Sequence, residues 1–132
     1  MKKNSLFLIV VIEVLVVTLL QLIPENINAE LLVTNSKFIF GLVGSNNIAI
    51  AILLLALVVF VYLTSKSKML IYSLADAMLI AGIASNLLDR IFRDGATDYI
   101  SIGNFPTFNI ADILIVIGII VLGISYILKL EK

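Results

Sequence analysis

The chain has 132 residues, of which 61% are hydrophobic and 14% charged, with nine basic and nine acidic residues and no histidine, cysteine or tryptophan. A soluble domain carries about 25% charged residues, and one core of this size could not enclose so much apolar surface, so the composition predicts a membrane protein. The absence of histidine and cysteine excludes the usual zinc, iron–sulfur and haem sites, as well as catalysis by a thiol or by a Ser-His-Asp triad. The zero net charge gives no electrostatic basis for binding nucleic acid. We therefore expect no metal, cofactor or nucleic-acid partner, and any chemistry must rest on carboxylates.

Four long apolar stretches predict helices, because about 20 residues rising about 1.5 Å each cross the hydrocarbon layer. The expected helices span about residues 5–24, 46–65, 69–91 and 107–129, and the first should end at Pro24. The alternation typical of barrel strands is missing from these stretches. The prediction is an all-α membrane protein with four transmembrane helices in a single domain, residues 1–132.

The connection between the first two helices predicts a small β-like segment. Residues 24–47 mix polar with β-branched residues and include Gly41 and Gly44, which suggests a short strand or hairpin at the membrane surface. Residues 91–107, between the third and fourth helices, hold Gly103 and Pro106 and are also irregular. Because irregular segments gather on one side of the membrane, we expect a functional site on that side.

The basic residues predict the orientation. Six lysines precede the first helix, lie between the second and third, or end the chain: Lys2, Lys3, Lys66, Lys68, Lys129 and Lys132. The opposite side has Lys37, Arg90 and Arg93. Since cytoplasmic loops hold the excess of lysine and arginine, both termini should be cytoplasmic and the β-like segment extracytoplasmic.

Two helix ends carry polar residues at helical spacing. Asn109 and Asp112 are three residues apart and would share a face of the fourth helix, although the positive N-terminal end of that helix could alone favour Asp112. In the third helix, Gly82, Asn86 and the pair Asp89 and Arg90 follow spacings of three and four. That ion pair could orient a neighbouring site or only anchor the helix end.

Asp98 stands on the irregular connection that leads to Asp112. Two carboxylates brought together in a partly dry pocket cannot both be ionised cheaply, so one keeps a proton and the pair holds an acid and a base. The base can activate water against a peptide carbonyl while the acid protonates the leaving group. The pattern therefore suggests an aspartic peptidase.

Three blocks resemble the bacterial lipoprotein signal peptidase family, signal peptidase II. They are Asn86-Leu87-Leu88-Asp89-Arg90, Asp98-Tyr99-Ile100 and Phe105-Pro106-Thr107-Phe108-Asn109-Ile110-Ala111-Asp112. The family signature reads G-N-x-x-D-R, V-x-D-F-I and F-P-x-F-N-x-A-D. The last block matches at every specified position, and the first has Ser85 in place of glycine. A weaker match to N-x-G-x-x-F has Asn35 and Phe40, with Lys37 at the glycine.

The resemblance implies an intramembrane aspartic endopeptidase of the bacterial cytoplasmic (inner) membrane, with its site toward the extracytoplasmic face. Such an enzyme removes the signal peptide of a prolipoprotein before the lipobox cysteine, after that cysteine has received diacylglyceryl. Asp98 and Asp112 correspond to the catalytic pair. The residues implied to bind substrate or support the site are Asn35, Gly82, Asn86, Asp89, Arg90, Asn109 and Ala111. The implied partners are lipid-modified prolipoproteins, membrane lipids and globomycin-type inhibitors, and we expect a monomer.

The first helix departs from the family. Where D-Q-x-x-K is usual, the chain reads Glu13-Val14-Leu15-Val16-Val17, so the lysine is absent. This departure leaves open a catalytically inactive relative. The polar residues would also suit a small proton-coupled transporter that uses Glu13, or a structural subunit whose polar groups join helices. Asp76, in the third helix, has no counterpart in the family, and we interpret it as reaching the headgroups or bonding a neighbouring helix.

Overall fold

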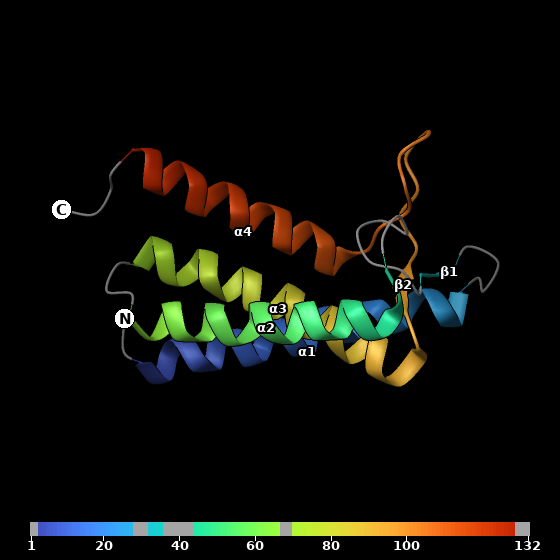
Figure 1. Ribbon diagram of the computed structural model, residues 1–132, viewed down its shortest axis with the longest axis horizontal. Helices are drawn as coiled ribbons and strands as arrows, with labels where there is room; N and C mark the ends of the chain where they lie inside the picture. The colour runs from blue at the N-terminus through green and yellow to red at the C-terminus, as the bar shows by residue number, and fades with distance from the viewer. Residues whose placement is uncertain (1–2, 28–31, 36–43, 67–69, 129–132) are drawn as a thin grey trace.

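The computed structural model describes residues 3–27, 32–35, 44–66 and 70–128. In chain order the elements are α1 (Lys3–Ile27), β1 (Val33–Asn35), α2 (Asn46–Lys66), α3 (Leu70–Arg93), β2 (Ala96–Asp98) and α4 (Ile110–Ile127). α1 begins and α4 ends at the same end of the bundle, and the two strands lie at the opposite end (Figure 1). Which end faces the cytoplasm stays a prediction. Of the basic residues behind it, Lys2, Lys37, Lys68, Lys129 and Lys132 lie outside the described residues.

The helices are apolar enough for a membrane. Among the described residues, three segments have the length and hydropathy to cross one, namely Asn46–Thr64, Ile71–Arg93 and Ile110–Ile127, and α1 contributes the shorter apolar segment Phe7–Leu19. Leu55 and Val58 of α2 are 67% and 66% exposed, as expected for side chains that face lipid. The protein is therefore a mostly helical membrane protein with a small sheet.

Two predicted helix limits are wrong. α1 does not stop at Pro24 but continues to Ile27, because a proline removes one backbone donor without forbidding the turns that follow it. α4 begins at Ile110 rather than at residue 107. Phe108 is instead in an extended conformation and pairs with Ile100, each N–H donating to the other's carbonyl at 3.0 and 2.8 Å.

α3 is the central helix of the bundle. It packs against α1, α2 and α4, and 67% of its span is buried, compared with 11% for α2 and 17% for α4. Its lower hydropathy fits this position, since a helix surrounded by other helices can carry small and polar residues that lipid would reject. The buried cluster of Leu53, Leu79, Ile83 and Leu87 joins α2 to α3.

The sheet joins the two irregular connections. β1 and β2 are antiparallel, with Val33 opposite Asp98, Thr34 opposite Thr97 and Asn35 opposite Ala96. β1 confirms the strand predicted within residues 24–47. Residues 28–31 and 36–43 of that segment lie outside the described residues. The pairing places Asp98 beside the ends of α3 and α4.

Candidate active site

Asp112 is held at the start of α4 by a capping box. The Asp112 N–H donates to Oδ1 of Asn109 at 3.0 Å, and the Asn109 N–H donates to Oδ2 of Asp112 at 3.1 Å. Asn109 therefore precedes the helix as its N-cap, which corrects the expectation that the two residues lie along one helix face. A carboxylate favoured by the positive helix end can still belong to a site, since the box leaves Oδ1 of Asp112 for another donor.

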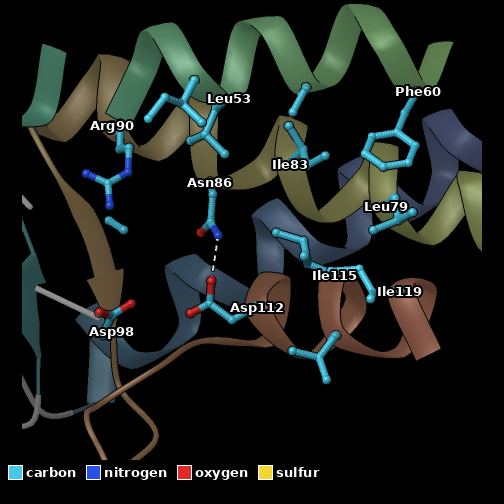
Figure 2. Close-up of a pocket in the computed structure, with 14 residues that line it drawn as sticks. Leu53, Phe60, Leu79, Ile83, Asn86, Arg90, Asp98, Asp112, Ile115 and Ile119 are labelled. Carbon is cyan, nitrogen blue, oxygen red and sulfur yellow. Dashed lines mark hydrogen bonds between the residues drawn. The ribbon is translucent and has the colours of Figure 1, made fainter. Parts of the chain in front are cut away.

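Two asparagine side chains link Asp112 to Asp98. Nδ2 of Asn86 donates to Oδ1 of Asp112 at 2.8 Å (Figure 2). Nδ2 of Asn109 donates to Oδ1 of Asn86 at 2.9 Å and to Oδ1 of Asp98 at 3.1 Å. Asn109 is fully buried, so this asparagine relay is shielded from competing water. The two carboxylates thus belong to one hydrogen-bonded unit.

Asp89 positions the strand that carries Asp98. Its carboxylate accepts hydrogen bonds from the Thr97 N–H and from Nη1 of Arg93. Asp89 forms an ion pair with Arg93, four residues along the same helix face, and also interacts electrostatically with the adjacent Arg90, the partner that the sequence suggests. Asp89 therefore supports the site through β2.

Arg90 brings a positive charge to the two candidate carboxylates. Its guanidinium interacts electrostatically with Asp98, Asp112 and Asp89, and Figure 2 shows it facing the same hollow as the first two. Nη1 of Arg90 donates to Oδ1 of Asn46 at 3.0 Å, and Nδ2 of Asn46 donates to the Arg90 carbonyl at 3.1 Å. Asn46 was not predicted; the only signal is its position as a polar residue directly before an apolar span.

Close packing of α3 and α4 brings Asn86 within reach of Asp112. A Cβ on Gly82 would lie 2.6 Å from the Ala111 carbonyl oxygen and 2.7 Å from Cγ1 of Ile115. Ala111 is itself fully buried. Because Asn86 is one turn beyond Gly82, any widening of this contact would lengthen the Asn86–Asp112 hydrogen bond.

Ser85, where the family signature has glycine, also has a defined contact. It is fully buried, and its hydroxyl shares a 3.4 Å hydrogen bond with Thr18 of α1. This departure from the signature therefore serves the contact between α1 and α3.

A second unpredicted contact involves Tyr99. Its hydroxyl accepts a hydrogen bond from the Ile110 N–H at 3.3 Å, so it satisfies one of the free donors at the start of α4. Burial raises the pKa of the Tyr99 phenol. The hydroxyl consequently stays neutral at physiological pH.

A cleft of about 370 Å³ opens in front of the carboxylates. Its polar end is formed by Asn86, Arg90, Asp98 and Asp112. The rest is lined by apolar residues of α2, α3 and α4, among them Ile52, Leu53, Phe60, Leu79, Ile83, Ile115 and Ile119 (Figure 2). We call this the α2–α4 groove. It can take an apolar chain whose end meets the two aspartates.

Two predicted residues lie away from these contacts. The backbone of Asn35 pairs with Ala96, and its side chain is outside the described part of the structure. Oε2 of Glu13, on α1, is buried and has no hydrogen-bond partner among the described residues. In that same described part, no group of three or more acidic residues is arranged to hold a metal ion.

The chain is similar to known peptidases over most of its length. The family described as "Signal peptidase (SPase) II" matches residues 6–128 of the chain. The lipoprotein signal peptidase of Wigglesworthia glossinidia brevipalpis is 33% identical over 99 residues, covering 68% of this chain and 65% of that protein. The enzyme of the same name from Dehalococcoides mccartyi is 43% identical over 56 residues, which is 42% of this chain.

The match to the Dehalococcoides mccartyi protein spans 35% of its length. A solved bacterial membrane enzyme has the same fold, with a TM-score of 0.82 at 24% identity, covering 98% of this chain and 91% of that one. The match over residues 6–128 decides the family. It follows that the chain belongs to the signal peptidase II family.

Proposed function

We propose that the protein is an intramembrane aspartic endopeptidase that removes the signal peptide from diacylglyceryl-modified prolipoproteins, cutting before the lipobox cysteine. The main support is the asparagine relay, in which Asn86 and Asn109 tie the carboxylates of Asp98 and Asp112 into one hydrogen-bonded unit. A pair of acids that served only to anchor helix ends would not need a shared set of donors at the mouth of a groove.

The two carboxylates divide the work of hydrolysis. One is ionised and takes a proton from a water molecule, which attacks the scissile carbonyl, while the other is protonated and donates to the developing oxyanion. When the tetrahedral intermediate collapses, the proton taken from water is delivered to the leaving amine. The other aspartate takes its proton back from the hydroxyl of the intermediate as the carbonyl re-forms, so the pair returns to its starting state. Arg90, which interacts electrostatically with both, limits how far negative charge builds up during the exchange.

The apolar part of the α2–α4 groove provides a place for the signal peptide. Its walls come from three helices with membrane-spanning hydropathy, so a hydrophobic segment could reach the aspartates without leaving the bilayer. We place the site toward the extracytoplasmic face of the bacterial cytoplasmic membrane and expect a monomer to be sufficient. Globomycin-type inhibitors should compete for the same groove.

The test is cleavage of a lipid-modified prolipoprotein by the purified protein in liposomes. Wild type should release the signal peptide and be inhibited by globomycin, and Asp98→Asn or Asp112→Asn should each abolish release. The unmodified precursor serves as the control substrate and should not be cut. If wild type is folded but cuts nothing, the chain is an inactive relative; if it instead carries a Glu13-dependent proton flux, a transporter function replaces the peptidase.

A further inference from the structure

A second cavity adjoins Asp112 on another side of α4. It has a volume of about 200 Å³ and is lined by Phe105, Phe108, Asp112, Ile113, Val116 and Ile117. We call it the α4 outer pocket. Asp112 and Val116, one turn apart, line both this pocket and the α2–α4 groove, so α4 separates the two cavities at the carboxylate itself.

The α4 outer pocket is built for an apolar ligand. Apart from Asp112, all its lining residues are aromatic or β-branched. The rings of Phe105 and Phe108 pack edge to face with centroids 5.9 Å apart and together form one side of the pocket. Ile113, Val116 and Ile117 are 37–49% exposed on a membrane-spanning helix, so the pocket opens toward lipid.

One wall of the α4 outer pocket comes from an uncharged hairpin. Residues 99–108 contain no charged side chain and are closed by the pairing of Ile100 with Phe108, and this hairpin stands beside the start of α4 (Figure 1). Phe105 reaches the pocket from this hairpin. A ligand could therefore enter from the lipid without passing a charged group.

The α2–α4 groove and the α4 outer pocket meet at Asp112, so a substrate bound there could have two apolar parts. A signal peptide in the α2–α4 groove leaves the α4 outer pocket, on the adjoining face of α4, for another part of the substrate. We propose that the α4 outer pocket holds an acyl chain carried on the substrate residue next to the cleaved bond. This inference rests on the proposed function and adds to it the location of the lipid.

The test compares two substrates with the same peptide and different lipids, S-dipalmitoylglyceryl and S-dibutyrylglyceryl. Ile117 lines the pocket five residues from Asp112, so Ile117→Trp should fill the pocket. Ile124→Trp is the matched control, because Ile124 is exposed on the same helix face and lines neither cavity. Ile117→Trp should raise KM for the palmitoyl substrate about tenfold and for the butyryl substrate less than about twofold. Ile124→Trp should change neither. Equal effects on both substrates, or the same selectivity in Ile124→Trp, would overturn the proposal.

A second measurement needs neither a variant nor cleavage. A palmitoyl substrate with a diazirine at the end of one acyl chain is irradiated with the wild-type protein in liposomes. Adducts should map to the segment that contains Phe105, Phe108, Ile113 and Ile117. Adducts confined to groove residues such as Ile52 and Leu79 would contradict the acyl-chain site. If the pocket is labelled but no substrate is cut, the proposed function fails and the lipid site stands.

Discussion

Asp112 and Asp76 lie in apolar helices toward opposite ends of the bundle, and their surroundings differ. Asp112 accepts hydrogen bonds from Asn86 and Asn109 and lines both cavities. Asp76, 4% exposed, is hydrogen-bonded to Thr64 of α2, which agrees with the expectation of a bond to a neighbouring helix, and it lines neither cavity. A carboxylate in a membrane helix is therefore not by itself a sign of chemistry. What distinguishes Asp112 is that it lines two cavities.

Neutralising each aspartate without changing its shape should give the largest difference between the two positions. Asp112→Asn should lower kcat at least about 1,000-fold, because the acid–base pair loses a member. Asp76→Asn should stay within about threefold of wild type, since an amide can keep the bond to Thr64. Both rates are measured with the same lipid-modified substrate in liposomes. Comparable losses would place Asp76 in the reaction and contradict the distinction.

Removing the asparagine relay should have the next largest effect. Asn109→Ala deletes the donor to Asp98 and Asn86 and the cap of α4, so kcat should fall about 100-fold through misplaced carboxylates. Asn104→Ala, an exposed asparagine of the hairpin, is the matched control and should retain wild-type activity. An active Asn109→Ala protein would show that Asp98 and Asp112 do not depend on the relay.

The contact between α3 and α4 can be tested separately from the chemistry. Gly82→Ala forces a methyl group against the Ala111 carbonyl and should destabilise the protein by about 1–3 kcal/mol. Gly123→Ala, on α4 with no atom within 4 Å of its new Cβ, should be neutral or stabilising. Thermal unfolding in detergent measures both. Equal unfolding temperatures for the two variants would mean that the helices can separate freely at Gly82.

The smallest expected effect concerns α1. Glu13 lies apart from both cavities, and Glu13→Gln removes its charge without changing its size. Cleavage should remain within about twofold of wild type. A large loss would give the first helix a part in catalysis despite the missing D-Q-x-x-K pattern.

The membrane class, the approximate helix limits and the residues of the motif blocks can be predicted from the amino-acid sequence. Apolar length and local motifs are properties of adjacent residues, so they can be read without coordinates. α4 begins three residues after the predicted start near residue 107, because the pairing of Phe108 with Ile100 competes with the helix. Such competition depends on a partner outside the local stretch.

The assembly of the site, by contrast, depends on contacts between elements. Three features of the site depend on segments that are separated in the chain or lie on different elements. They are the pairing of Val33 with Asp98, the hydrogen bond between Asn46 and Arg90, and the second cavity beside Asp112. Helical and strand periodicity predict which way a side chain points within its own element, but not which element it meets. Those contacts arise when α3 is enclosed by its neighbours, because that packing sets which polar groups are buried together and must satisfy one another.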